Sequence, residues 1–455
     1  MSQCSPIAFN AAAAVSTRRG VCPSLAAPMQ TGDGLLTRLR PLGNSLTPEQ
    51  FARIATEAMR HGNGILEITA RGNLQVRGLS ADSAPLFSQA VLAMDFPLAG
   101  GLAIETPPLS GFDPDEVTDA RELAEQLAET VAACEPALSL AAKLSITVDG
   151  GGRFHLGGVA ADIRLSAERR DGAPFWRLGL AGDAAGAQTV AVLPQGEAVA
   201  AVMALLRKLS AMGRKARGRD LDVREWQAYF GPFAASEPAA AQKILPLPGI
   251  HQWLDRAVLG LGLPFCQIDA RTLIAFLGEM DAIGCREIRL APDHGFFLIG
   301  IEPAHLDAAR QRAAAHGFIT RPGDPANAIA LCAGSRGCAS AFFDTQALAR
   351  QLIAEGEALL DGSLTVHLSG CPKGCAHPAA AALTFTAAPT GYALVVNGSA
   401  SGSPDAYIAA KDVAAVLAAL GRLAGDNRQA GESAAECLER LGRETILDAV
   451  RRVRQ

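Results

Sequence analysis

Four cysteines in two short loops place the strongest constraint on this chain. Residues 332–338 form a C-x5-C motif, and residues 371–375 form a C-x3-C motif further along. Glycines stand beside the thiols in both loops, so the backbone can bend around a bulky ligand. Soft thiolates that converge from short loops are typical of iron–sulfur clusters. The spacing therefore predicts a 4Fe–4S cluster held by Cys332, Cys338, Cys371 and Cys375.

Two other interpretations of these thiols stay open. Structural zinc also takes four cysteines, but usually from closer C-x2–4-C pairs. In the third interpretation the four thiols are buried and bind nothing. The remaining cysteines occur singly, and we expect them to be small buried hydrophobes or spare thiols. They are Cys4, Cys22, Cys134, Cys266, Cys285 and Cys437.

Length and composition bound the class of protein. The chain has 455 residues, of which 49% are hydrophobic and 19% charged, so we expect a globular protein of several domains. A net charge of −5 argues against binding to nucleic acid. No apolar run is long enough to span a membrane, and Arg18 and Arg19 follow the Ala-rich start instead of preceding it, unlike a secretory signal. These features predict a cytoplasmic location.

Two stretches repeat one pattern of elements. Residues 35–69 and residues 262–290 each read as strand, helix and strand, with apolar residues at helical spacing in the middle. The tract Thr47-Pro48-Glu49-Gln50 predicts the start of the first helix, with an N-cap, a first-turn proline and a first-turn acid. A further strand follows each copy. A period of more than 200 residues indicates domain duplication, whereas chance likeness between two α+β segments is the plain alternative.

Several motifs resemble the sulfite and nitrite reductase superfamily. The resemblance rests on residues 330–334, on His367 to Cys375, and on the Thr-x-Arg segment of residues 69–75. It implies an α+β fold with duplicated ferredoxin-like half-domains and two larger α/β sulfite-reductase-like domains, related by a pseudo-two-fold axis. The implied half-domains span 28–100 and 244–305, the larger domains span 101–232 and 320–425, and a tail covers 426–455.

Within that superfamily, three tracts resemble the precorrin-3B synthase family. They are residues 19–39, 143–156 and 371–378. The resemblance implies an O2-dependent monooxygenase that hydroxylates precorrin-3A at C-20 with lactone formation, in aerobic cobalamin biosynthesis. No G-x-G-x-x-G motif follows a strand, so we expect electrons from an external donor.

The resemblance also indicates site residues. It implies that Arg71 and Lys143 are catalytic. Because the substrate carries carboxylates, further cations are expected to bind them. Substrate-binding candidates are Arg38, Arg40, Arg77, Arg153 and Lys373, with Arg19 and Arg336 as further basic residues, although a solvated surface charge is the plain alternative for each. The resemblance also implies a mononuclear non-haem iron, whose ligands are not evident in the sequence. His155, His367 and His377 are the histidines nearest the motif loops, and a hydrogen-bonding group without a metal is the plain alternative for each.

Two alternative functions remain at this point. A sirohaem-dependent sulfite or nitrite reductase is the first, but Leu144 and Ser145 follow Lys143, so the pair of lysines two apart that binds sulfite is missing. A non-catalytic iron–sulfur electron carrier is the second. Arg71 has no basic counterpart in residues 291–293 of the second copy, which predicts one active and one structural site.

Overall fold

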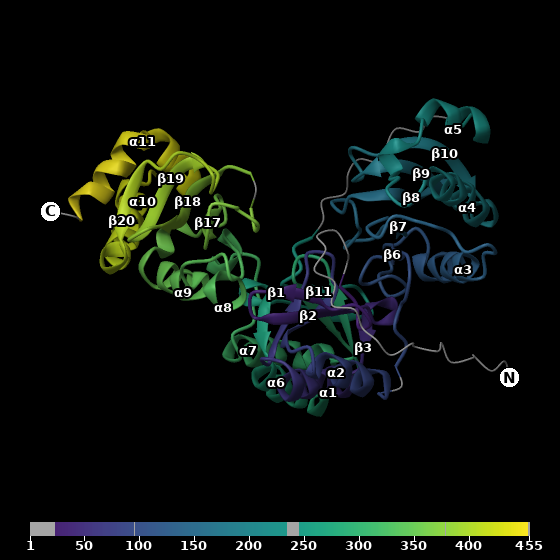
Figure 1. Cartoon of the computed structure of the whole chain (residues 1–455), viewed down its shortest axis with the longest axis horizontal. Helices are drawn as coiled ribbons and strands as arrows, with labels where there is room; N and C mark the ends of the chain where they lie inside the picture. Colours follow the sequence, from purple (N-terminus) through teal and green to yellow (C-terminus); the bar gives the residue numbers. More distant parts are fainter. Residues whose placement is uncertain (1–22, 95, 234–244, 378, 454–455) are drawn as a thin grey trace.

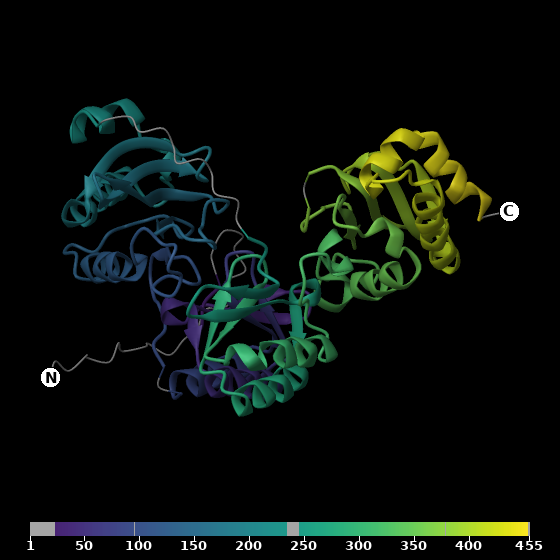
Figure 2. The same ribbon diagram turned by 180° about the vertical axis from the view of Figure 1, so that it is seen from behind.

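The described residues form a central unit with an outer unit on either side. The computed structural model describes residues 23–94, 96–233, 245–377 and 379–453. These residues contain four five-stranded sheets, two in the centre and one in each outer unit (Figure 1). The view from behind shows the outer units diverging from the centre (Figure 2). Arg19, Cys4 and Cys22 lie outside the described residues.

The first half of the central unit begins with a hairpin. Its elements are β1 (Met29–Thr31), β2 (Gly34–Leu39), β3 (Ser45–Leu46), α1 (Pro48–His61), β4 (Ile65–Ile68), β5 (Leu74–Leu79) and α2 (Ser83–Leu92). The α1 helix starts where the sequence predicts, because Thr47 and Gln50 form a capping box and Pro48 occupies the first turn. Phe51, Ile54 and Ala58 form its buried face.

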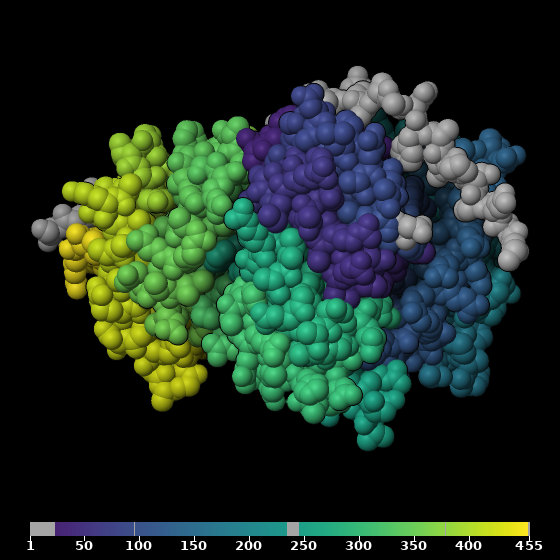
Figure 3. Space-filling view, turned by 90° about the horizontal axis from the view of Figure 1, so that it is seen from below, coloured from purple at the N-terminus to yellow at the C-terminus, as the bar shows by residue number. Residues whose placement is uncertain are grey.

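The second half repeats this order. Its elements are β11 (Gly249–Gln252), β12 (Ala257–Gly262), β13 (Gln267–Asp269), α6 (Ala270–Ala282), β14 (Glu287–Ala291), β15 (Gly295–Ile299) and α7 (Leu306–Ala315). Asp269 caps α6 by accepting from the N–H groups of Arg271 and Thr272. The helices α1, α2, α6 and α7 lie on one face of the central unit (Figure 1), and the view from below shows the two halves side by side (Figure 3).

The two halves exchange one strand each. The central sheets have the orders β1-β2-β5-β4-β13 and β11-β12-β15-β14-β3, so β13 joins the first sheet and β3 joins the second. Ile268 of β13 pairs with Leu66, and Leu46 of β3 pairs with Ile288. One continuous apolar core runs through both halves. This reciprocal pairing confirms the predicted duplication and makes the two halves a single folded unit.

Each outer unit has its own sheet and core. The first contains β6 (Ala103–Glu105), α3 (Ala120–Ala132), β7 (Ser145–Asp149), β8 (Ala161–Arg170), β9 (Ala173–Gly182), β10 (Gln188–Pro194), α4 (Gln195–Met212) and α5 (Val223–Phe230). The second, called here the cluster unit, contains β16 (Ile329–Leu331), α8 (Gly334–Gly337), α9 (Thr345–Glu355), β17 (Val366–Ser369), β18 (Ala381–Ala388), β19 (Gly391–Gly398), β20 (Ala406–Ala409), α10 (Val413–Asn427) and α11 (Ala434–Arg452).

The outer units share one topology. In each, the first three strands are parallel and the last two antiparallel: β6, β7 and β8 correspond to β16, β17 and β18. The structure thus has the predicted α+β class with a pseudo-two-fold arrangement. The segment expected as a tail forms α11, whose Leu438, Ile446 and Val450 are buried in the core of the cluster unit. Among the described residues, no helix combines the length and apolar character needed to cross a membrane.

Candidate active site

The four predicted cluster cysteines follow two neighbouring parallel strands. Leu331 of β16 is paired with Leu368 of β17, so both strands end at the same edge of the sheet. Cys332 comes directly after β16, and Cys371 comes two residues after β17. The N–H of Gly370 donates to Cys332 Sγ at 3.2 Å. The carboxyl ends of adjacent parallel strands are where α/β folds place their ligands, and here they bring Cys332 against the C-x3-C loop.

The remaining two thiols are carried to the same edge by the loops. Cys338 ends the short α8 turn, and its carbonyl accepts from Ala341 N–H at 3.0 Å. The next residue, Phe342, donates to the Gly370 carbonyl at 2.9 Å, which joins the two cysteine loops. Gly370 permits this approach, since a Cβ there would lie 2.5 Å from the Ala341 side chain. Cys375 lines the same pocket as Cys332.

This donor set fits an iron–sulfur cluster. All four thiols are free, and they range from the buried Cys371 to the exposed Cys375. Gly334 and Gly374 both have φ near +60°, a backbone conformation that glycine adopts without strain. Within the described ranges, no three His, Cys, Asp or Glu side chains are grouped as ligands of a single metal ion.

A pocket of about 270 Å³ adjoins the cysteines where the cluster unit meets both halves of the central unit. Its walls come from three separate parts of the chain. The cluster unit supplies Leu331, Cys332, Ala333, Cys375 and Ala376; the first half supplies Glu67, Ile68, Thr69, Ala70 and Gln75; the second supplies Phe265, Cys266, Gln267 and His294. Burial, helped by nearby Glu67, raises the pKa of the Cys266 thiol to about 12. Cys266 therefore stays protonated, in keeping with a spare thiol.

Arg71 points from the central unit toward the first outer unit. Its Nη1 lies 2.6 Å from Glu105 Oε2, and its Nη2 donates to the Ala160 carbonyl at 2.5 Å. Burial raises the pKa of Glu105 even though Arg71 opposes that shift. The backbone of Arg71 bridges to Pro292, its counterpart across the pseudo-two-fold axis. Arg71 directly follows Ala70, which lines the pocket, and its side chain is 39% exposed.

Lys143 lies elsewhere. It is exposed in the turn before β7, and Asp149 lies at the other end of that strand. Ser145, at the position of the missing second lysine, is 5% exposed and its N–H donates to Asp162 Oδ2 at 3.0 Å. The structure therefore does not bring Lys143 and Arg71 together by any contact within the described part of the chain, and the catalytic assignment of both stays a prediction.

The predicted substrate-binding cations are spread over three units. Arg38 faces Gln75 of the pocket wall. With the Gln75 amide oriented so that its oxygen faces Arg38, that oxygen accepts from Arg38 Nη2 at 2.7 Å. Arg40 donates to the Gly101 carbonyl at 2.8 Å. Arg153 pairs with Asp115 at 2.6 Å and lies over the Trp253 ring. Lys373 is exposed and donates to Ser340 Oγ at 2.9 Å.

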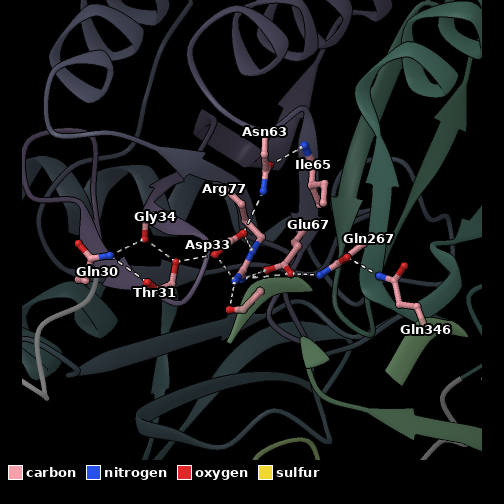
Figure 4. Close-up of polar contacts among 11 residues, drawn as sticks. Gln30, Thr31, Asp33, Gly34, Asn63, Ile65, Glu67, Arg77, Gln267 and Gln346 are labelled. Carbon is pink, nitrogen blue, oxygen red and sulfur yellow. Dashed lines mark hydrogen bonds and ion pairs between the residues drawn. The ribbon is translucent and has the colours of Figure 1, made fainter. Parts of the chain in front are cut away.

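Arg77 is the most enclosed of these candidates. It is 6% exposed and makes ion pairs with Asp33 and Glu67. Figure 4 shows it at the centre of a chain of polar side chains that crosses from the hairpin of β1 and β2 to α9. Its role in substrate binding stays a prediction.

Two histidines lie together behind the cysteine loop. His367 of β17 is fully buried, and neither ring nitrogen has a hydrogen-bond partner within the described residues. Burial, followed by the charge of His377, lowers the pKa of His367 to about 4, so the ring is neutral at neutral pH. The rings of His367 and His377 have centroids 5.7 Å apart. His155 lies in the first outer unit, where its Nδ1 accepts from Gly157 N–H at 3.0 Å.

Sequence reasoning missed Arg164 of β8. This arginine is 4% exposed, lies 3.6 Å from Asp149, and has two guanidinium nitrogens without a hydrogen-bond partner among the described residues. Burial lowers its pKa. The sequence did contain a signal for a buried arginine here, because Arg164 stands between Ile163 and Leu165 in an apolar strand.

The loop of the C-x3-C motif has a counterpart in the first outer unit. Gly150 follows β7 just as Gly370 follows β17, so residues 150–155 are the counterpart of residues 370–375. By this register, Gly151 stands in place of Cys371 and His155 in place of Cys375. The two ligands of the C-x3-C motif are therefore absent from this counterpart loop.

Comparisons with known proteins agree with this architecture. Residues 27–94 match the family model described as the nitrite/sulfite reductase ferredoxin-like half domain. The solved structure of the NirA protein of Mycobacterium tuberculosis superposes with a TM-score of 0.66 at 18% identity, covering 91% of this chain and 84% of that one. A ferredoxin–nitrite reductase of Synechococcus elongatus is 24% identical over 75% of this chain and 74% of its own. The fold is thus of the nitrite and sulfite reductase type.

A much more similar relative narrows the family. A precorrin-3B synthase of a Sinorhizobium species is 50% identical over 445 residues, which cover 97% of each chain. The chain belongs to the precorrin-3B synthase family.

Proposed function

We propose that this protein is an O2-dependent monooxygenase that hydroxylates precorrin-3A at C-20, with lactone formation, in aerobic cobalamin biosynthesis. The observation that carries the proposal is the 50% identity to a precorrin-3B synthase over nearly the whole of both chains. The pocket supports it, because it joins two cluster thiols to polar groups from both halves of the central unit. We place the enzyme in the cytoplasm, with an external electron donor.

The pocket suggests how the substrate would bind. Ligand pockets usually measure roughly 300–1,000 Å³, so a volume of about 270 Å³ suits one edge of a tetrapyrrole. Gln75 and Thr69 offer polar groups to that edge. The rest of the macrocycle, with its carboxylates, would extend toward Arg38 and Arg71, where guanidinium groups can bind carboxylates in bidentate fashion. Glu105 would then yield its place on Arg71 to a substrate carboxylate.

The cluster would be held by Cys332, Cys338, Cys371 and Cys375. When bound, it supplies single electrons to the adjacent pocket. The chain contributes the N–H of Gly370, which donates to Cys332 Sγ at 3.2 Å. Phe265 and Leu331 form apolar parts of the pocket wall and limit access of water to the reacting edge.

A mononuclear non-haem iron would fit beside this site on His367 and His377. A neutral imidazole is the form that binds iron, and His367 has two buried ring nitrogens without a partner in the described structure. We expect His367→Ala to lower the ratio of iron to acid-labile sulfide while sulfide content is unchanged. An unchanged ratio would rule out this ligand.

One experiment tests the activity. Protein purified without oxygen is incubated with precorrin-3A and labelled O2, and the product mass is measured. The proposal expects one labelled oxygen atom per product. If no label is incorporated while the cluster is intact, the chain is an electron carrier or tetrapyrrole-binding protein instead.

Absorbance distinguishes the proposed monooxygenase from a sirohaem-dependent reductase. A strong Soret-type band in the purified protein, with sulfite or nitrite reduction, would overturn the monooxygenase proposal. The buried Ser145 next to the single Lys143 favours the expected outcome, which is no such band.

A further inference from the structure

Arg77 reaches from the central unit to the cysteine loop of the cluster unit. Its Nη2 donates to the Gly337 carbonyl at 2.9 Å, and Gly337 is the residue before Cys338. The two residues are 260 positions apart in the chain. A Cβ at position 337 would lie 2.8 Å from Arg77 Nη2, so glycine is what allows the guanidinium to approach the loop.

All three nitrogens of the Arg77 guanidinium donate hydrogen bonds. A guanidinium has five N–H donors. Nε and Nη2 donate to the two oxygens of Asp33 at 2.9 and 2.8 Å, and Nη1 donates to both oxygens of Glu67 at 3.2–3.3 Å. The bond to Gly337 uses the other N–H of Nη2. Two carboxylates already neutralise the single charge of Arg77, so a positioning role fits it better than binding of a substrate carboxylate.

The partners of Arg77 are themselves held in place. Asp33 also accepts from Thr31 Oγ1 at 2.8 Å and from Asn63 Nδ2 at 3.0 Å. Burial alone would raise the pKa of Asp33, but the hydrogen bonds and charge of Arg77 outweigh it and hold that pKa below its usual value. Asp33 is therefore ionised at neutral pH, and the ion pair to Arg77 is permanent there.

The chain of contacts continues to the other side of the loop. Gln267 Nε2 donates to Glu67 Oε1 at 2.5 Å, and Gln346 Nε2 donates to Gln267 Oε1. Gln346 Oε1 in turn accepts from Arg336 Nη1 at 3.2 Å. Figure 4 shows this chain from Asp33 through Arg77 and Glu67 to Gln346. The first half of the central unit thus contacts the loop that carries Cys338 directly, and the second half reaches it through Gln346 of α9.

The turn between β1 and β2 adds a steric contact. A Cβ at Gly32 would overlap the backbone of Cys338 and Ala339. Only glycine lets this turn lie against the loop. The Thr-Gly-Asp-Gly tract therefore has two structural roles: Gly32 permits the approach, and Asp33 orients Arg77.

We propose that Arg77 is a positioning residue that fixes the C-x5-C loop against the central unit and so sets the position and reduction potential of the cluster. The inference about the potential rests on the proposed cluster, whereas the inference about the loop does not. Because these hydrogen-bonded ion pairs are buried, they restrict the position of the loop. Any shift of the loop would leave donors or carboxylates unpaired in the interior.

The molecule contains a matched control. In the other half of the pseudo-symmetric structure, Arg289 of β14 pairs with Glu287 at 2.7 Å and donates to the Ser110 carbonyl at 2.8 Å. The loop that contains Ser110 follows β6 as the C-x5-C loop follows β16. Arg289 is equally buried, at 7% exposed, but contacts a loop without cysteines.

The test compares Arg77→Gln with Arg289→Gln in the full chain, with the cluster bound and after its removal by chelation. Amide hydrogen exchange is measured for peptides covering 332–343 and 107–112. We expect Arg77→Gln to speed exchange in 332–343 by about tenfold or more, and Arg289→Gln to do so only in 107–112. Unchanged exchange in 332–343, or equal acceleration of both loops by both variants, would overturn the proposal.

Two further measurements complete the test. In the cluster-bound Arg77→Gln protein, loss of a positive charge should lower the reduced-to-oxidised ratio at a fixed potential by about threefold or more. A potential equal to that of Arg289→Gln would contradict the effect on the cluster. If Arg77→Gln does not fold, Asp33→Asn and Arg77→Lys serve in its place, since each weakens the bidentate pair without emptying the site. Failure of the protein to bind iron would refute the proposed cluster but leave the exchange experiment valid.

Discussion

The N–H of Gly370 donates to Cys332 Sγ across 3.2 Å, which joins the ends of two adjacent parallel strands. This contact brings a C-x5-C cysteine into reach of the C-x3-C loop. It also makes the cysteine site dependent on the sheet, because a shift of register between β16 and β17 would separate the thiols.

Replacing one ligand should reduce cluster content. We expect Cys375→Ser to lower iron and acid-labile sulfide to less than about half of the wild-type values, because a serine hydroxyl is a poor ligand for iron–sulfur clusters. Cys266→Ser is the control, since this thiol lines the same pocket but is held protonated. Full iron and sulfide in Cys375→Ser would show that the ligand assignment is wrong.

Adding a methyl group at Gly32 should displace the cysteine loop. We expect Gly32→Ala to lower cluster occupancy, because the new Cβ would overlap the backbone of Cys338 and Ala339. Iron content and the cluster absorbance measure this effect. Gly278→Ala in α6 is the control: a Cβ there meets open space, and a stability gain of about 0.5–1 kcal/mol is expected instead. Equal iron content in the two variants would contradict this account of Gly32.

Arg71 should matter for substrate more than for the cluster. We expect Arg71→Lys to reduce turnover of precorrin-3A by about tenfold or more, because lysine keeps the charge but loses the bidentate fork. Iron and sulfide content should stay at the wild-type level, since Arg71 contacts Glu105 and the Ala160 carbonyl and not the cysteine loops. Wild-type turnover in this variant would exclude Arg71 from the catalytic site.

Glu116 should make stability fall with rising pH. Burial raises its pKa to about 7, above the value of about 4.3 for an unfolded chain. Between these values the folded protein holds a proton that the unfolded chain releases, so the stability from this group is complete below about pH 4 and declines as pH rises through about 7. We expect Glu116→Gln to gain up to about 2 kcal/mol over wild type between pH 5 and pH 8 in denaturant titrations. An equal difference between the two proteins at both pH values would refute this assignment.

The sequence was sufficient for the local features. Thr47, Pro48 and Gln50 specify the start of α1 through contacts within one turn, and the structure confirms them. The repeat was visible as well, because both copies keep the same alternation of apolar residues. The exchange of β3 and β13 could not be predicted, because the residues of a short strand do not determine which sheet it joins.

The basic residues show the same limit. Charge gave Arg38, Arg40 and Arg77 the same prediction, that of binding a substrate carboxylate. In the structure, Arg77 pairs with two carboxylates and donates to a carbonyl, whereas Arg38 faces Gln75 of the pocket wall. Arg164 was missed because its burial depends on strands that are distant in the chain.

The sequence by itself predicted the four cluster thiols and indicated the family, because ligand chemistry and motif spacing depend on residues that are close together in the chain. Only the tertiary structure decided that Gly337 would meet Arg77 from 260 positions away, that Gly32 would lie against Cys338, and that residues 150–155 would mirror the cysteine loop. These relations depend on how separate sheets pack and pair, and that packing is fixed by the burial of the whole core and not by any local segment.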